Sequence, residues 1–180
     1  MKDRVNMVEN TLKINEKELM DFYGYSGSFG KIKLKIRLLN SWILHSIAYS
    51  SPHPGVTKAM QKARGVKIGE NCHIAPYVQF DWLYPDQISI EDNVAIGSNT
   101  MIFAHVNIGT NVFLKSKYPR TVSKVIIKSG AWINPGCIIT AGVTIGENSI
   151  ISVGSVVTND VPDNCIVAGN PARIIKKIQE

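Results

Sequence analysis

The stretch Ile139-Thr-Ala-Gly-Val-Thr-Ile145-Gly-Glu-Asn-Ser-Ile-Ile151-Ser-Val-Gly-Ser-Val-Val157 carries a branched aliphatic residue at every sixth position. An amphipathic helix repeats its apolar face every three to four residues and a half-buried strand every two, so neither element explains this period. Short strands joined by tight corners do explain it, because every sixth side chain then points inward and stacks on the neighbouring coils. The spacing therefore predicts a β-solenoid.

The same period extends well beyond this stretch. Apolar residues recur every six positions in three series, which run from Ile68 to Phe80, from Ile90 to Leu114 and from Ile127 to Val157. Interruptions are expected at residues 81–89 and 115–126. Gly, Asn, Ser and Asp stand between the aliphatic positions, where Gly and Asn tolerate positive φ and short polar side chains satisfy turn backbone groups. We expect a mainly β chain with the repeat running from about residue 66 to residue 157.

Composition is typical of a single soluble domain, since 180 residues with 44% apolar content can bury a continuous core. The cysteines are Cys72, Cys137 and Cys165, an odd number at wide spacings, which indicates free thiols in a reducing compartment. The sequence has no apolar run long enough to span a bilayer and no secretory signal at its start. These features predict a cytoplasmic protein whose mature chain starts at Met1.

Positive charge is concentrated in the first third of the chain. Residues 1–65 hold 11 Lys and Arg against 5 Asp and Glu, whereas residues 66–180 hold 9 of each. Residues 31–50, KIKLKIRLLNSWILHSIAYS, have helical apolar spacing at Leu39, Trp42, Ile43 and Ile47. We favour a helix packed on the solenoid or on a neighbouring subunit; a membrane surface is the alternative that we do not favour. Nucleic acid is not an expected partner, because no binding motif accompanies this one basic run.

Two repeats and the end of the chain carry a resemblance to a known family. Ile96-Gly-Ser-Asn-Thr-Met and Ile145-Gly-Glu-Asn-Ser-Ile fit the pattern aliphatic-Gly-x-x-small-x, and VTNDVPDNCIVAGNPARIIKK at 157–177 resembles the end of the solenoid in hexapeptide-repeat acyltransferases. The similarity covers about residues 64–178 and is to the branch with galactoside and maltose acetyltransferases and the O-acyltransferases of surface-polysaccharide synthesis. It implies a left-handed parallel β-helix and a homotrimer with active sites between subunits.

The resemblance also implies how the chain is divided. An N-terminal helical segment is expected at 1–65, the β-helix at 66–168 and a closing C-terminal helix at 169–180. The first 60 residues depart from the sugar acetyltransferases, and KIRLLNSWILHS at 35–46 looks more like the envelope-glycan acyltransferases. The implied function is coenzyme A-dependent acyl transfer, with O-acetylation of a saccharide hydroxyl as the first choice. The alternatives are N-acetylation of an amino sugar or nucleotide sugar, and a trimeric scaffold without catalysis.

Acyl transfer from a thioester to a hydroxyl needs a base, and His105 is the candidate. A neutral imidazole at cytoplasmic pH suits this role and typically contributes about 10²–10⁴ in rate. Ile90-Glu-Asp-Asn-Val94 precedes His105 by the interval that separates a similar motif from the catalytic histidine in sugar acetyltransferases. The alternative is that His105 only fills a corner. We read His73, on a solenoid position beside Cys72, as structural.

The acyl donor implied by the resemblance is acetyl-CoA. By motif position, Val153 and Thr158 would line its pantetheine arm, and Arg173 and Lys176 would bind its phosphates, although the same charges also suit a terminal helix. Trp132 would cover the arm or simply fill a corner. No oxyanion donor is assigned, because the family's donor position coincides with Pro135, which has no N–H.

The acceptor is expected at the interruption Phe80-Asp81-Trp82-Leu-Tyr84, since carboxylates bind sugar hydroxyls and aromatic rings stack on sugars. Asp81 is the chosen substrate-binding residue, with an ordinary turn residue as the alternative. Lys115, Lys117, Arg120 and Lys124 in the second interruption either receive an acidic acceptor or are solvated. No metal is expected, because the closest histidines, His45 and His53, are eight positions apart.

Overall fold

The structure is a computed structural model that describes residues 2–179, with side chains described from residue 11. It divides into two compact units, and each is described by itself. One unit holds the chain up to Asn40 together with Val106–Thr121, and the other holds Ser41–His105 together with the chain from Val122 onward. This division differs from the three consecutive segments expected from the sequence, because a segment between two strands leaves the repeat.

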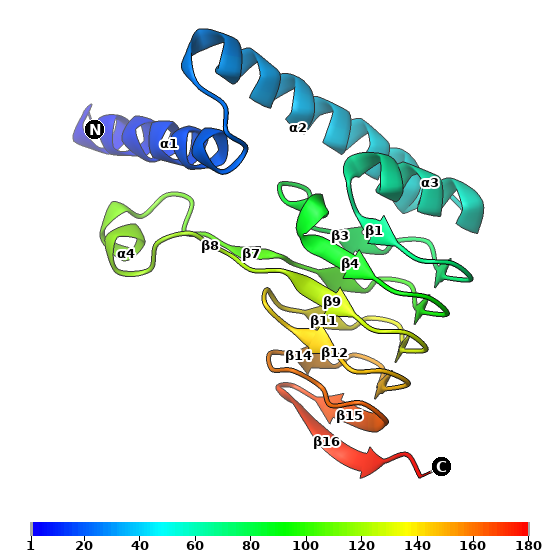
Figure 1. Cartoon of the computed structure of the whole chain (residues 1–180). Helices are drawn as coiled ribbons and strands as arrows, with labels where there is room; N and C mark the ends of the chain where they lie inside the picture. Colours follow the sequence, from blue (N-terminus) through cyan, green and yellow to red (C-terminus); the bar gives the residue numbers. More distant parts are fainter. Residues whose placement is uncertain (1, 180) are drawn as a thin grey trace. The chain divides into compact units, whose positions relative to one another are not determined.

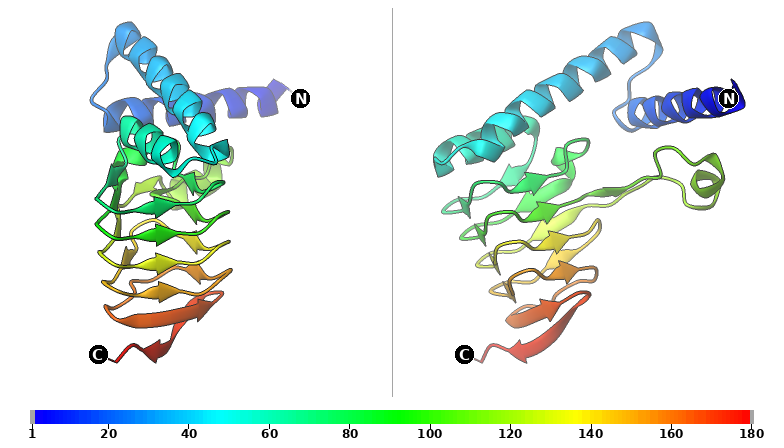
Figure 2. Two further views of the ribbon diagram at one scale, coloured as in Figure 1. Left: turned by 90° about the vertical axis from the view of Figure 1, so that its right-hand side faces the viewer. Right: turned by 180° about the vertical axis from the view of Figure 1, so that it is seen from behind.

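The second unit is built from short parallel strands in three sheets, and successive coils lie one above another (Figures 1 and 2). Each coil contributes a strand to each sheet in turn, which is the arrangement predicted for a solenoid. The first sheet has β1 (Lys67–Ile68), β4 (Ile88–Ile90), β9 (Val125–Ile127) and β12 (Thr144–Ile145). The second has β2 (His73–Ile74), β5 (Ala95–Ile96), β10 (Trp132–Ile133), β13 (Ile150–Ile151), β15 (Cys165–Gly169) and β16 (Ala172–Lys177). The third has β3 (Gln79–Phe80), β6 (Met101–Ile102), β11 (Ile138–Ile139) and β14 (Val156–Val157).

The core consists of three columns of the residues that recur every six positions. The second sheet contains one of these columns. Its inward residues pair directly from strand to strand and are Ile74, Ile96, Ile133, Ile151 and Val167. All five are buried. Full burial of such a side chain stabilises the fold by roughly 1.5–3 kcal/mol, so the stacked columns are the main source of cohesion between coils.

The glycine of the repeat is required by the close approach of neighbouring coils. A Cβ on Gly146 would lie 2.4 Å from the backbone nitrogen of Asp163, and one on Gly97 would lie 2.5 Å from that of Pro135. These contacts are shorter than any side chain can accept, so the position after the inward aliphatic residue must be glycine here. The corner asparagines contribute differently, since Asn93 and Asn148 adopt positive φ, which Asn tolerates better than most residues.

Two helical stretches in the second unit pack beside the first coil. Helix α2 (Gly27–Ser50) ends here and is followed by α3 (Pro54–Arg64), which begins after the N-cap His53 and ends at Gly65. The hydroxyl of Thr57 donates to the Ala48 carbonyl at 3.2 Å. A short 3-10 helix, η1 (Pro85–Gln87), occupies the first interruption of the repeat, where an interruption was expected.

The first unit contains α1 (Lys2–Phe22), the beginning of α2 and the short helix α4 (Val112–Lys117). The chain enters and leaves the α4 segment through β7 (His105–Val106) and β8 (Thr121–Val122), which form a two-stranded sheet. The helix predicted at 31–50 is confirmed, because these residues lie within α2. None of the helices within the described residues is long and apolar enough to cross a membrane.

Two expectations about secondary structure were wrong. The six-residue series does not continue past Ile102, because Ile108 and Leu114 belong to the α4 segment, where the Asn111 side chain caps a helix by accepting from the Leu114 amide at 2.9 Å. The C-terminal helix is also absent from residues 169–179, since Ala172–Lys177 is strand β16, paired antiparallel with β15. A turn at Gly169 returns the chain along β15, so that β16 satisfies the backbone groups that β15 would otherwise expose at the sheet edge.

Candidate active site

His105 and Asp81 lie side by side because neighbouring strands end next to each other. Asp81 directly follows β3, and His105 comes three residues after β6, which pairs with β3 through Phe80 and Ile102. Nδ1 of His105 and Oδ2 of Asp81 are 2.5 Å apart. An ionised carboxylate only accepts hydrogen bonds, so Nδ1–H of His105 donates, and Nε2 of the neutral ring keeps its lone pair. This tautomer is the one that a general base requires.

The carboxylate of Asp81 is held by the backbone as well as by the histidine. Its Oδ1 accepts from the amides of Leu83 and Tyr84 at 3.0 and 3.1 Å, and its Oδ2 accepts from the Ala104 amide at 2.9 Å. Burial would raise the pKa of Asp81, but the hydrogen bond and charge of His105, with the amides of Ala104 and Tyr84, outweigh burial and lower this pKa. Asp81 is therefore ionised across the physiological range and fixed in orientation.

The acceptor-binding role expected for Asp81 does not fit this geometry. Its side chain is 0% exposed, and both carboxylate oxygens already accept two hydrogen bonds each. A carboxylate in this state has no room for an acceptor hydroxyl, and its contact with His105 points to a positioning role in place of acceptor binding. His105, by contrast, keeps 16% of its side chain exposed.

Tyr84 is a residue of the site that sequence reasoning did not single out by itself. Its ring is fully buried, and its centroid lies 5.1 Å from that of the His105 imidazole at an interplanar angle of 57°. The ring thus forms a rigid wall beside the base. The available signal was its position three residues after Asp81, but nothing in the sequence separates a packed tyrosine from a sugar-stacking one.

A buried polar network supports the Asp81 loop from the side of the helices. Nη2 of Arg64 donates to the Asp81 carbonyl at 2.9 Å, and Nε of Arg64 donates to the Ser41 hydroxyl at 3.1 Å. Ser41 in turn donates to the Trp82 carbonyl at 2.9 Å. His45 lies in the same network, 3.1 Å from Nη1 of Arg64, and burial followed by the Arg64 charge lowers its pKa to about 4. His45 is therefore neutral and structural.

The residues assigned to the acyl donor are all exposed but lie on two sheets. Trp132 on β10, together with Arg173 and Lys176 on β16, belongs to the six-stranded sheet. Thr158 follows β14 at the edge where Asp81 and His105 follow β3 and β6, and Val153 stands at the corner between β13 and β14. Of these five, only Arg173 borders a cavity of about 320 Å³ between β14 and β16, which Asn159 and Ile174 also line. The other four residues do not line this cavity.

The oxyanion donor remains without an assigned residue. Pro135 has no N–H, and the amide of the next residue, Gly136, already donates to the Ser98 carbonyl at 2.9 Å. The Gly136 amide is therefore already engaged between neighbouring coils.

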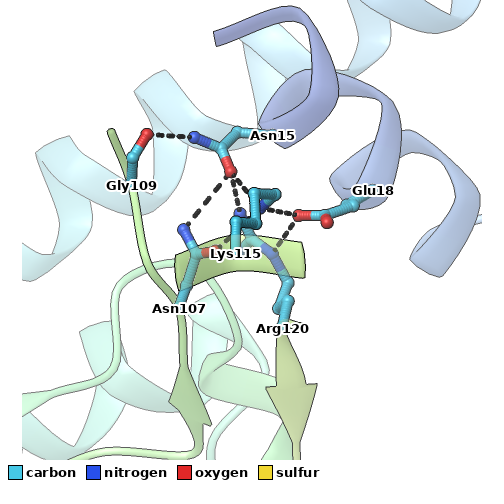
Figure 3. Close-up of polar contacts among 6 residues, drawn as sticks. All are labelled: Asn15, Glu18, Asn107, Gly109, Lys115 and Arg120. Atoms are coloured by element: carbon cyan, nitrogen blue, oxygen red, sulfur yellow. Dashed lines mark hydrogen bonds and ion pairs between the residues drawn. The ribbon is translucent and has the colours of Figure 1, made fainter. Parts of the chain in front are cut away.

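The basic residues of the α4 segment are largely engaged within the first unit, as Figure 3 shows. Nζ of the buried Lys115 donates to Asn15, Glu18 and Asn107 at 2.7, 2.8 and 3.1 Å. Nε of Arg120 donates to the same Glu18 carboxylate at 2.9 Å. Two of the four cations considered for an acidic acceptor thus tie the segment to α1, while Lys117 and Lys124 keep solvent contact.

Within residues 11–179, whose side chains the structure describes, no three His, Cys, Asp or Glu side chains gather as metal ligands would. The three cysteines are free thiols, and Cys137 and Cys165 are buried in the solenoid.

Comparison with known proteins identifies the repeat. The family model described as bacterial transferase hexapeptide (six repeats) matches residues 124–159, and that of the hexapeptide repeat of succinyl-transferase matches residues 87–115. YvoF of Bacillus subtilis, provisionally named an acetyltransferase, is 32% identical over 81% of this chain and 80% of its own length. The galactoside O-acetyltransferase of Escherichia coli is 29% identical over 80% of each chain.

Solved structures give the same result. A galactoside acetyltransferase in complex with coenzyme A matches with a TM-score of 0.65 and 28% identity, over 81% of this chain and 82% of the other. A maltose O-acetyltransferase from Clostridium difficile matches with a TM-score of 0.61 and 26% identity, over 82% and 89%.

Proposed function

This chain belongs to the bacterial hexapeptide-repeat transferases, and from that premise we propose that it transfers an acetyl group from acetyl-CoA to a hydroxyl of a saccharide, with His105 as the general base. The observation that carries the proposal is the His105–Asp81 pair, in which a buried carboxylate fixes the tautomer and orientation of a partly exposed imidazole. A corner-filling histidine would need neither feature.

The chemistry follows from that tautomer. Nε2 of His105 takes the proton of the acceptor hydroxyl as its oxygen bonds to the acyl carbon, and the carbon–sulfur bond then breaks. The imidazolium returns the proton to the departing thiolate, so the products are an acetyl ester and the free thiol of coenzyme A. Asp81 stabilises the charged ring while it holds the proton, and such a base is worth about 10²–10⁴ in rate.

The exposed side chains support acetyl-CoA as the donor. Trp132 and Val153 are 51% and 72% exposed, which suits apolar contact with a long flexible arm. Arg173 and Lys176 are exposed cations on β16, and cations of this kind bind phosphates. Acetyl-CoA would supply the activated thioester, and Thr158 lies along the same sheet edge as the base.

We further infer a left-handed parallel β-helix and a homotrimer. The cofactor residues of one chain lie on different sheets, so a site that uses all of them together with His105 needs a second subunit. The acceptor in this proposal is a saccharide of the kind used in surface-polysaccharide synthesis, which the galactoside O-acetyltransferases among the relatives support. An N-acetyltransferase for amino sugars or nucleotide sugars would use the same base, and only the acceptor would differ.

The test is the release of free thiol from acetyl-CoA by the purified protein in the presence of saccharides, amino sugars and serine. His105→Ala should lower kcat by about 10²–10⁴ and leave donor affinity nearly unchanged, because the imidazole acts only as the proton leaves. His73→Ala is the matched control, since His73 is exposed on β2 away from this pair. Wild-type turnover in His105→Ala with the true acceptor would refute the proposal, and no thiol release with any acceptor would favour the scaffold.

A further inference from the structure

Helix α2 has two opposite faces, and among residues 11–179, whose side chains the structure describes, only one of these faces is covered. Leu34, Ser41 and Ala48 recur every seven residues and are buried at 2%, 6% and 0% exposure. On the opposite side, large apolar side chains recur at three- and four-residue spacing and remain open to solvent. Within the first unit these are Phe29, Ile32, Ile36 and Leu39, exposed by 79%, 54%, 62% and 57%.

This open stripe, Phe29-Ile32-Ile36-Leu39, continues along the same helix. Ile43 and Ile47 extend it at the same spacing, and Trp42 stands at its border, all three more than 40% exposed. At 1.5 Å per residue the apolar line from Phe29 to Ile47 is about 27 Å long. Exposed apolar surface of this extent on one helix face is uncommon and typically marks a docking surface.

The charges around the stripe identify the kind of partner. Helix α2 has four basic residues and not one Asp or Glu in its 24 residues. With about 100° between successive residues, the exposed Lys33 and Lys35 fall on opposite flanks of the stripe. An apolar stripe with lysines on both borders matches a lipid surface with negative headgroups, where the stripe enters the acyl boundary and the lysines meet phosphates.

A second copy of the chain fits this face less well. Two α2 stripes placed against each other would bring the flanking Lys33 and Lys35 of both copies together, with no acidic residue of α2 to balance them. Two acids of α1 already have partners, because Glu16 pairs with Lys31 at 3.3 Å and Glu18 pairs with Lys115 and Arg120 at 2.8 and 2.9 Å. The charge pattern therefore favours an external anionic surface.

We propose that the exposed face of α2 docks the enzyme on an anionic membrane surface as a peripheral, non-spanning helix. The buried face with Leu34 keeps the helix attached to the protein, which agrees with the packing expected from the sequence. The open stripe adds a second contact that the sequence left as the less favoured alternative.

The full-length protein should float with vesicles of phosphatidylcholine mixed with phosphatidylglycerol, and much less with phosphatidylcholine alone. Salt at about 1 M should release it, because screening then acts within about 3 Å. Lys33→Gln with Lys35→Gln should weaken binding on the order of 30-fold, and Ile36→Ser about tenfold or more. Matched controls are Lys67→Gln with Lys124→Gln and Val56→Ser, which change solvent-accessible residues of similar types elsewhere.

Each remaining outcome overturns the proposal. Absence of binding to the anionic vesicles at low salt, equal binding to both vesicle types, or equal loss in the control variants would each do so. A lower oligomer mass for Ile36→Ser by light scattering would assign the stripe to a second copy of the chain. Circular dichroism and melting temperature show whether a variant has kept its fold, and thiol release by folded Ile36→Ser in solution should match wild type.

Discussion

The carboxylate of Asp81 makes two kinds of contact at the site. Asp81 fixes the His105 ring and at the same time caps the backbone turn that carries Leu83 and Tyr84. Since Arg64 holds the carbonyl of the same residue, both ends of Asp81 are anchored. The fold therefore sets the position of the proposed base before any substrate arrives, and efficient general-base catalysis requires such preorganisation.

Asp81→Asn should lower both stability and turnover. One acceptor oxygen becomes an NH₂ group that faces backbone N–H donors, so at least one hydrogen bond is lost at a buried position, at a cost of about 1–3 kcal/mol in unfolding free energy. The ring of His105 also loses its fixed tautomer, and kcat should fall by about 10²–10⁴. Urea denaturation and steady-state kinetics with thiol detection measure the two effects on the same preparation.

Asp92→Asn is a control that tests backbone capping without any contact with His105. Oδ1 of Asp92 accepts from the Glu70 amide at 2.6 Å, so this carboxylate also caps backbone, but it is exposed and lies in a different corner of the solenoid from His105. It should lose stability with unchanged kcat. If Asp81→Asn behaves in the same way, Asp81 supports the turn and has no positioning effect on the base.

At the residue scale, the sequence could single out a candidate where a motif fixes the spacing, but not a contact that depends on burial. The interval after Ile90-Glu-Asp-Asn-Val94 pointed to His105, whereas the contact made by Asp81 depends on which strands become neighbours in the sheet. Exposure could not be read from residue type, so a buried Tyr84 and an exposed Trp82 were indistinguishable in sequence.

The prediction of secondary-structure elements also depended on more than local spacing. Every sixth residue identified the inward columns, because each coil repeats one geometry. Ile108 and Leu114 keep that spacing by coincidence, because Ile108 lies in the loop before the Asn111 cap and Leu114 lies in helix α4. At Ala172–Lys177 the family resemblance implied a helix, but the open edge of β15 and the adjacent β-branched Ile174 and Ile175 favoured a strand.

The α4 segment should depend on Lys115. Lys115→Met keeps much of the length and apolar stem of the side chain but removes three hydrogen bonds to Asn15, Glu18 and Asn107, a local cost of about 1–3 kcal/mol. Hydrogen exchange at 106–121 should then accelerate while exchange in the solenoid strands stays constant. Lys117→Met is the control, because Lys117 is exposed on the same helix; equal acceleration in both variants would contradict the assigned role.

Packing of α2 and α3 should make stability depend on pH through His45. The pKa of His45 is lowered to about 4 in the folded state, by burial first and then by Arg64, whereas an unfolded histidine titrates near 6.5. Between these values the unfolded chain binds more protons, so stability is full above about pH 6.5 and falls as the pH drops towards 4. The contribution is on the order of 2 kcal/mol, below the value of the full shift because solvent reaches part of the ring.

His45→Gln should flatten this part of the profile. Unfolding free energies from urea titrations at several pH values between 4 and 6.5 give the slope directly. The change to Gln at exposed His73 should leave the wild-type slope. A His45→Gln profile as steep as wild type would show that another group causes the acid sensitivity.

At the scale of the whole molecule, the part of the chain with excess positive charge and the part with the proposed catalytic site are different. Residues 66–180 are neutral in sum and include the proposed chemistry, while the basic excess is in residues 1–65, where the open face of α2 lies. The sequence could predict this division, because it needs only counting. It could not predict that the segment 106–121 joins the N-terminal unit, since that requires contacts between residues about a hundred positions apart.

Because the proposed cofactor residues lie apart on one chain, we expect a trimer whose active sites are shared between subunits. If the site lies between subunits, His105 of one chain works with Trp132, Arg173 and Lys176 of a neighbour, and light scattering should give three times the mass of the chain. Coexpression of His105→Ala with Arg173→Ala then yields mixed trimers in which some sites combine an intact base with an intact donor surface. Such mixtures should regain part of the activity that each variant lacks alone, whereas a site contained in one chain would regain none. A stable monomer with full activity would also contradict the trimer, because the donor surface and the base would then have to meet within one chain.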